Sequence, residues 1–488
     1  MKFTRSLGLA VLAAAVLTAC GGSSNDVSPG PIIDSSIPNA RGTLVANPPP
    51  VLTAFTAAEY TAALNASASG RSLLQLAGTP KCGINFHYME YNTVGGANEP
   101  TNATGGIMVP TGTDAACTGA RPVLLYAHGT TIDRNYNIAS PANGEAGLVA
   151  AMYAAQGFIV VAPNYAGYDA SRLTYHPYLN AEQQSNDMVD AMRAAKRAFP
   201  NIAANASDKL VISGYSQGGH VAMATAKAIQ ERYSSEFKVT ALGGMSGPYA
   251  LTNTLQTVFA GGVNAGATIF SPLIFTSWQK AYGNLYSATS DVYEAPFATG
   301  IETLLPSTTL NTTTVFTTGR LPTRLFATGA LVTQDPALNA LFAAGIGTPN
   351  LIKQSYRQAV LSNPSHPVFT AAAKNDLTGW TPARPVAMCM GAADPTVFAS
   401  NTSVAATEFG KRGVSSLVSV FNVEDAATVG PQVAAAFQAA KAATAADPNA
   451  PGASPAEKVV QAYHGGLVPP FCNAVIRGYF QQVIASNR

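Results

Sequence analysis

Charged residues are scarce in this sequence. Lys, Arg, Asp and Glu make up 11% of its 488 positions, against about 25% in a typical soluble protein. The formal net charge is +2 and no run is rich in Lys or Arg, so the chain lacks the basic patch that binding to phosphates requires. This excludes an electrostatic nucleic-acid binder. Apolar residues still amount to 47%, which is enough to bury a sizeable core.

Long apolar runs are also missing after the N-terminus, where no segment stays apolar for the roughly 18 residues of a membrane-spanning helix. The N-terminus itself has a positive start at Lys2 and Arg5. An apolar stretch from Leu7 to Leu17 follows, and it is too short to span a bilayer. This pattern predicts an export signal. A surface poor in charge agrees with a protein that works outside the cytoplasm.

The end of this signal, Leu17-Thr18-Ala19-Cys20, resembles the bacterial lipobox. The resemblance implies a lipoprotein signal peptide over 1–19 and lipidation of Cys20, with Gly21 favouring the outer membrane. An ordinary signal peptide, in which Cys20 is incidental, is the alternative. Residues 20–55 are rich in Gly, Ser, Asn and Pro and predict a flexible tether. We expect a protein of the cell envelope, either anchored to the membrane by lipid alone or secreted.

Cysteine is rare, with five in all. Apart from Cys20 these are Cys82, Cys117, Cys389 and Cys472, and none lies in a C-x-x-C pair, which argues against a zinc site. We find no phosphate-binding Gly-rich loop and no metal-ligand cluster, so we predict neither a cofactor nor a metal. An even number of cysteines in an oxidising compartment predicts two disulfides.

Buried strands and helices alternate along most of the chain. Short apolar runs predict strands, and helical spacing predicts helices between them. This alternation predicts an α/β fold with a mostly parallel sheet covered on both faces. The predicted strands are 121–127, 158–162, 209–213, 239–242, 385–390 and 414–423, and the predicted helices are 144–157, 180–199, 217–233, 401–412, 428–446, 455–463 and 472–485, with a break at 464–466.

The alternation stops over 248–380, which has many Thr, Gly and Pro residues and only apolar helical stretches. We predict that this segment is an inserted, mainly helical cap or lid. The core of the fold then consists of 56–247 and 381–488.

A short motif, Gly214-Tyr215-Ser216-Gln217-Gly218, stands between the predicted strand 209–213 and the helix that follows. It fits the G-x-S-x-G pattern of a nucleophile elbow, which needs a sharp turn from strand to helix. The small residues let the chain turn, and the helix N-terminus favours developing negative charge near Ser216. Without that context the motif would be an ordinary turn with Ser as N-cap.

These features resemble the α/β-hydrolase superfamily, over roughly 80–247 and 381–488. The resemblance is to bacterial secreted esterases and lipases, through Gly-Tyr-Ser-Gln-Gly-Gly-His at the elbow and His-Gly-Thr at 128–130. It implies an α/β-hydrolase fold and a nucleophile, an acid and a histidine in that chain order. It also implies that Gln217 and a residue after the early strand, here Thr130, supply backbone N–H groups to an oxyanion.

A serine nucleophile needs a base, and three histidines follow Ser216. His220 is only four residues further on, in the predicted helix of the elbow, and points along that helix. His366 lies inside the predicted cap, whereas His464 follows the last strands and opens onto two glycines, as a base on a loop would. For the acid we predict Asp394, because it follows a buried strand and a glycine. The rival acids are Asp376, Glu424 and Asp425.

The resulting hypothesis is a serine esterase or lipase that acts on a small-molecule or lipid ester through an acyl-enzyme. Ser216, Asp394 and His464 would form its triad. The alternatives are a serine peptidase on the same fold and a binding lipoprotein without activity. We expect a monomer.

The proposed fold also favours one disulfide pairing among the three that four cysteines allow. Cys82 and Cys117 flank two strand-like runs, 84–91 and 105–109, that can fold back on each other. Cys389 precedes Asp394 and Cys472 follows His464. If those two residues hydrogen-bond, their cysteines are already close.

Overall fold

A computed structural model describes residues 40–327 and 349–486 of the chain. The predicted signal peptide, Cys20 and the start of the predicted tether lie outside these residues. The described part is built on a nine-stranded sheet with the order β1-β2-β3-β5-β4-β6-β7-β8-β9. The strands are β1 (Val51–Phe55), β2 (Gly83–Val94), β3 (Pro100–Thr111), β4 (Arg121–Ala127), β5 (Ile159–Pro163), β6 (Ala206–Tyr215), β7 (Val239–Met245), β8 (Val386–Met390) and β9 (Val418–Asn422).

The sheet has an antiparallel edge and a parallel body. β1, β2 and β3 pair antiparallel in chain order, and β3 pairs antiparallel with β5. From β5 to β9 every neighbouring pair is parallel. The inner parallel strands β4, β5, β7 and β8 are buried on both faces along nearly their whole length, as their apolar sequences require, whereas the edge strand β9 is half-buried. The carboxyl ends of β6 and β8 therefore lie at the same edge of the sheet.

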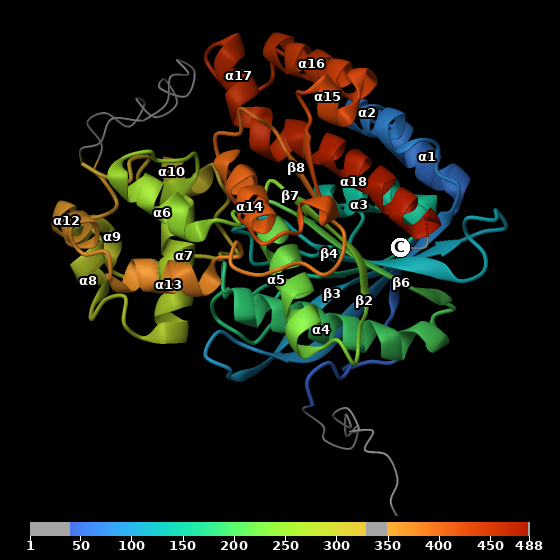
Figure 1. Cartoon of the computed structure of the whole chain (residues 1–488), viewed down its shortest axis with the longest axis horizontal. Coiled ribbons are helices and arrows are strands. Elements are labelled where there is room, and N and C mark those ends of the chain that lie inside the picture. The colour runs from blue at the N-terminus through green and yellow to red at the C-terminus, as the bar shows by residue number, and fades with distance from the viewer. Residues whose placement is uncertain (1–39, 328–348, 487–488) are drawn as a thin grey trace, which may run out of the picture. The chain divides into compact units, whose positions relative to one another are not determined.

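Helices cover both faces of this sheet (Figure 1). Successive side chains of β4 alternate between two hydrophobic clusters. Val123 and Leu125 pack with α4 (Ala181–Ala198) and α5 (Gln217–Arg232), while Leu124 and Tyr126 pack with α3 (Gly144–Met152) and α18 (Val468–Ala485). This alternation follows from the two-residue period of a strand. The helices outside the insertion are α1 (Ala57–Asn65), α2 (Ala68–Ala77), α3 (Gly144–Met152), α4 (Ala181–Ala198), α5 (Gln217–Arg232), α14 (Ser400–Lys411), α15 (Ala426–Val429), α16 (Pro431–Ala446), α17 (Pro455–Ala462) and α18 (Val468–Ala485).

The last part of the predicted tether is bound to the core, so the prediction of a flexible 20–55 is wrong there. Arg41 forms an ion pair of 2.8 Å with the buried Asp190 of α4, and the N–H of Gly42 donates to the carbonyl of Asn92. Val51–Phe55 then adds β1 to the sheet. Composition alone missed this attachment, because it depends on backbone pairing with β2 and on one charged partner.

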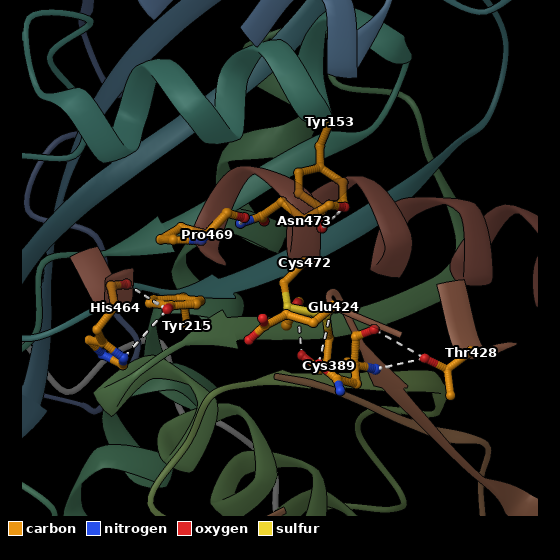
Figure 2. The surroundings of a disulfide bond; sticks show 12 residues. Tyr153, Tyr215, Cys389, Glu424, Thr428, His464, Pro469, Cys472 and Asn473 are labelled. Atoms are coloured by element: carbon orange, nitrogen blue, oxygen red, sulfur yellow. Dashed lines mark hydrogen bonds between the residues drawn. A yellow bond between two sulfur atoms is a disulfide. The ribbon is translucent and has the colours of Figure 1, made fainter. Parts of the chain in front are cut away.

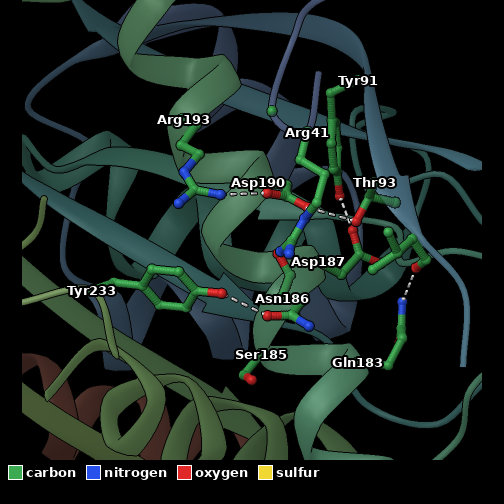
Figure 3. Close-up of polar contacts among 12 residues, drawn as sticks. Arg41, Tyr91, Thr93, Gln183, Ser185, Asn186, Asp187, Asp190, Arg193 and Tyr233 are labelled. Atoms are coloured by element: carbon green, nitrogen blue, oxygen red, sulfur yellow. Dashed lines mark hydrogen bonds and ion pairs between the residues drawn. The ribbon is translucent and has the colours of Figure 1, made fainter. Parts of the chain in front are cut away.

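Helix α4 buries a polar stripe where it meets β2 (Figure 3). The hydroxyl of Tyr91 donates to Asp187 (2.7 Å), and that of Thr93 donates to Asp190 (2.9 Å). Asp190 also receives Arg193 from the next turn of the helix (2.9 Å). These contacts satisfy two carboxylates whose burial would otherwise be costly.

The segment between β7 and β8 is a helical insertion, as predicted. Within its described part the only β-type contacts are isolated bridges, such as Tyr293 with Ile352. Trp278 is fully buried in its hydrophobic cluster, and the indole N–H donates to Leu179 of the core (3.2 Å). Residues 328–348 of the predicted cap lie outside the described residues. The helices of the insertion are α6 (Leu251–Ala260), α7 (Ala267–Tyr282), α8 (Thr289–Val292), α9 (Ala295–Ala298), α10 (Thr314–Thr317), α12 (Gln354–Ser362) and α13 (Pro367–Asn375).

The predicted break at 464–466 is wrong. α17 continues through a π-helical turn, Tyr463–Leu467, directly into α18. Two adjacent glycines are typical of a helix end, but Gly465 and Gly466 lie inside this wide turn. Such turns occur as single insertions in longer helices and are frequent at functional sites. His464 therefore lies on a helical turn and not on a loop.

Both disulfides have the predicted pairing. Cys82 is bonded to Cys117, across the hairpin of β2 and β3. Cys389 of β8 is bonded to Cys472 of α18.

Candidate active site

The turn between β6 and α5 has the geometry of a nucleophile elbow. Ser216 has a φ of +59° and a ψ of −123°, a left-handed conformation that is strained for a residue with a side chain. Close packing explains the glycines around it: a Cβ on Gly218 would lie 1.9 Å from the carbonyl oxygen of Ala127. The Ser216 hydroxyl does not cap α5, so it is free to bond elsewhere.

The predicted base and acid lie next to this hydroxyl. Nε2 of His464 is 2.8 Å from Oγ of Ser216, and Nδ1 is 2.7 Å from Oδ2 of Asp394. Oδ1 of Asp394 accepts the backbone N–H groups of Thr396 (2.9 Å) and Val397 (3.0 Å). The Asp394 carboxyl is thus held by its own loop, and it orients the imidazole toward the serine. This is the arrangement in which a histidine can accept a serine proton.

Tyr215 is a site residue that sequence analysis missed. Its hydroxyl donates to the carbonyl oxygen of His464 (2.6 Å) and so fixes the π-helical turn above the elbow (Figure 2). The motif treats this position as variable, and the contact joins residues far apart in the chain. No sequence signal could have indicated it.

The rival residues have other partners. Glu424 accepts the hydroxyl of Tyr463 and pairs with Lys441 (2.9 Å). Asp425 caps α15 through the N–H of Ala427. The other two also serve helix starts and turns: Asp376 accepts the N–H of Thr252 at α6, and His366 caps α13. None of them forms a hydrogen bond or an ion pair with Ser216 or His464.

The two predicted oxyanion donors, Thr130 and Gln217, each line a cavity that Ser216 also lines. The backbone N–H groups of Thr130 and Gln217 have no acceptor among the described residues. Gln217 is the first residue of α5, where N–H groups are unpaired and the helix dipole favours negative charge. Its side chain is held by His176 (2.6 Å between Nε2 atoms). Burial lowers the pKa of His176 to about 3, so this imidazole is neutral and can accept.

His128 has a structural role in the loop after β4 that carries Gly129 and Thr130. Its ring is buried between those of Tyr136 and Tyr165, with centroids 4.2 and 4.1 Å away. Burial lowers its pKa to about 4. Its two ring nitrogens bond to the carbonyl oxygens of Gly129 (2.7 Å) and Asn164 (3.0 Å), so it braces the loop.

Comparisons with known proteins agree with this geometry. Residues 143–376 match the family model for secretory lipases. The rice cell wall degrading esterase LipA from Xanthomonas oryzae has a similar structure, with a TM-score of 0.71 and 27% identity over 92% of this chain and 100% of LipA. A Legionella pneumophila protein named as a hydrolase has a TM-score of 0.67 at 19% identity, over 91% of this chain and 99% of its own, which supports the fold alone.

The chain is an α/β-hydrolase of the secreted esterase and lipase type. It is a carboxylic ester hydrolase. No curated protein sequence matches it. The family match ends at residue 376, before both Asp394 and His464, so the roles of these two residues depend on the geometry.

Two cavities of the hydrolase meet at Ser216. The larger one, of about 540 Å³, is lined by Thr130, Glu145 and His464. The smaller one, of about 60 Å³, extends among apolar side chains of the insertion such as Leu255 and Ile274. Phe270 of α7 lines both. A larger hollow of about 760 Å³ lies at the amino ends of the strands, around Phe199 and Phe237, and includes none of the predicted site residues.

Two further findings concern the described residues only. Their His, Cys, Asp and Glu side chains form no group that could hold a metal ion. None of their helices has the length and apolar character to cross a membrane.

Proposed function

We propose that this hydrolase cleaves carboxylic esters through an acyl-enzyme intermediate at Ser216. The observation that carries the proposal is the pair of contacts made by His464, one to the Ser216 hydroxyl and one to the Asp394 carboxyl. A histidine held in this way can remove the serine proton and return it.

In the proposed reaction, Oγ of Ser216 attacks the ester carbonyl carbon while Nε2 of His464 takes the hydroxyl proton. Asp394 keeps the Nδ1 proton in place and stabilises the imidazolium. The N–H groups of Thr130 and Gln217 stabilise the negative oxygen of the tetrahedral intermediate. His464 then protonates the leaving alcohol. A water molecule, deprotonated by the same histidine, releases the acid.

The two cavities suggest where each half of the ester binds. His464 must reach the oxygen of the leaving alcohol, and His464 lines only the larger cavity. We therefore place the alcohol there and the acyl chain in the small apolar cavity beside Gln217. This placement supports short acyl chains as the preferred substrates, with the helical insertion acting as a cap over the site.

A fluorophosphonate probe and a substrate panel test the proposal. We expect the probe to label the wild-type hydrolase at Ser216 and to leave Ser216→Ala unlabelled. Ser277→Ala is the matched control, because Ser277 is a buried serine of α7 outside the site; this variant should be labelled like the wild type. The protein should hydrolyse short p-nitrophenyl esters. Absence of labelling would indicate a binding lipoprotein, and faster cleavage of aminopeptidase substrates than of esters would indicate a peptidase.

We also propose that the mature protein is a monomer held in the cell envelope by lipid on Cys20. The lipobox-like segment supports the anchor. Metabolic labelling with a fatty acid should mark the wild type and not Cys20→Ser, and a labelled Cys20→Ser would exclude the anchor.

A further inference from the structure

Glu145 is an acidic residue beside the active site that the proposed reaction does not use. It lies in the first turn of α3, where the Asn143 side chain accepts the N–H groups of Glu145 (3.0 Å) and Ala146 (3.1 Å) and so fixes the start of the helix. Glu145 lines the same cavity as Ser216 and His464.

The carboxyl of Glu145 accepts three donors. Its two oxygens lie 3.1 and 3.2 Å from the backbone N of Gly129. The hydroxyl of Tyr126 donates to Oε1 (2.9 Å), and that of Tyr136 donates to Oε2 (3.3 Å). Burial raises the pKa of Glu145 to about 7. A carboxyl with this set of neighbours acts as an acceptor, and among the described residues its one backbone partner is Gly129.

Gly129 precedes Thr130, whose N–H is one of the two proposed oxyanion donors. The carbonyl of His128 is held by the hydroxyl of Tyr165 (2.9 Å), and the side chain of Thr130 by Tyr178 (2.8 Å). Between these two anchors the chain passes through a glycine, the residue with the greatest backbone freedom. Two contacts restrict this rotation: the carbonyl of Gly129 is bonded to Nδ1 of His128 (2.7 Å), and its N–H is bonded to Glu145.

We propose that Glu145 is a positioning residue of the hydrolase, which holds the N–H of Gly129 and thereby directs the N–H of Thr130 toward the oxyanion. The inference rests on the proposed function, since it needs Thr130 as an oxyanion donor. It adds a residue that acts on the oxyanion through the backbone of Gly129 and Thr130.

The test compares Glu145→Leu, which removes the acceptor, with Glu145→Gln, which keeps an amide oxygen for the N–H of Gly129. We expect Glu145→Leu to lower kcat by about 100-fold, as loss of one oxyanion donor does, with little change in KM. Glu145→Gln should recover most of this loss. Glu182→Leu is the matched control, because Glu182 lies in the first turn of α4 and is exposed; it should retain wild-type activity.

A second measurement separates misplacement of the donor from a general loss of structure. A trifluoromethyl ketone forms a tetrahedral adduct with the serine, so its affinity should fall in Glu145→Leu by the same factor as kcat/KM. Gly129→Ala should reduce the effect of Glu145→Leu, because a Cβ there meets nothing closer than 3.5 Å and alanine limits rotation.

Several outcomes would overturn the inference. One is unchanged kcat/KM and ketone affinity in a folded Glu145→Leu. Another is a loss in Glu145→Gln as large as in Glu145→Leu, which would assign the effect to charge. A failure of the wild type to react with the fluorophosphonate would instead overturn the proposed function, so the two failures are distinguishable.

Discussion

At the scale of single residues, the site depends on which group each carboxyl is bonded to. Asp394, Glu424 and Asp425 all follow strands at the carboxyl edge of the sheet, and the sequence distinguishes them only by context. In the structure, Asp394 bonds to His464, Glu424 to Lys441 and Tyr463, and Asp425 to the start of α15. The three carboxyls are therefore distinguished by their partners and not by their positions along the chain.

The first prediction follows from these partners. Asp394→Asn should lower kcat by several orders of magnitude, because the amide cannot stabilise the His464 imidazolium and favours the wrong tautomer. Asp425→Asn is the matched control and should change kcat little, since asparagine also caps helices. Steady-state hydrolysis of a p-nitrophenyl ester measures both. A large loss in Asp425→Asn with an active Asp394→Asn would reassign the acid.

The second prediction concerns Asp187, whose side chain is fully buried. Its carboxyl accepts the hydroxyl of Tyr91 and the backbone N–H of Ala166, each at 2.7 Å (Figure 3). Burial raises its pKa to about 7, against about 3.9 in an unfolded chain. The folded state thus binds a proton that the unfolded state releases, so this residue's contribution to stability is complete below about pH 4 and is lost as the pH rises to about 7.

Asp187→Asn removes this dependence, because asparagine does not ionise. The free energy of unfolding of the variant minus that of the wild type should therefore rise between pH 4 and 7, by at most about 4 kcal/mol. The neutral buried histidines act in the opposite direction, but they are common to both proteins and cancel. Asp208→Asn, at an exposed site, should show a constant difference. Denaturant unfolding at several pH values measures this; a constant or falling difference for Asp187→Asn would refute the assignment.

At the scale of elements, the parallel strands were predictable and the details of the site were not. The strand predicted at 121–127 is β4 with the same bounds, because a short apolar run between turn residues has few other solutions. The elbow was predictable because close packing requires its glycines, which leave a recognisable local pattern. The helical turn that carries His464 was missed, because its glycines have the local features of a helix end. The partners of Tyr215, Glu145 and Arg41 depend on contacts between distant segments, which no local pattern contains.

The third prediction belongs to α7, where Phe270 lines both cavities. Phe270→Ala should join them and move the preference toward longer acyl chains, because the removed ring leaves apolar space beside Ser216. Phe316→Ala is the control, since Phe316 is also half-buried in the insertion and lines neither cavity. The ratio of kcat/KM between long and short p-nitrophenyl esters measures the change. An equal ratio in Phe270→Ala and the wild type would mean that the acyl chain binds elsewhere.

At the scale of the whole molecule, two disulfides connect distant parts of the chain in different places. Cys82–Cys117 closes the hairpin of β2 and β3, with a sequence separation of 35. Cys389–Cys472 has a separation of 83 and joins β8, which leads to Asp394, to α18, which follows His464 (Figure 2). Only the second bond connects the two elements that adjoin the acid and the base.

The fourth prediction separates stability from geometry by removing each disulfide in turn. In the chain-entropy model the two bonds stabilise the fold by similar amounts, about 4 and about 5 kcal/mol. Replacing either pair by serine should therefore lower Tm to a comparable extent. At temperatures where both variants remain folded, however, Cys389→Ser/Cys472→Ser should lose more kcat, because α18 can then shift against β8 and His464 against Asp394. Cys82→Ser/Cys117→Ser is the matched control and should keep its kcat. Parallel measurement of Tm and kcat tests this directly: equal kcat in the two folded variants would show that the hydrogen bond between His464 and Asp394 does not need the disulfide.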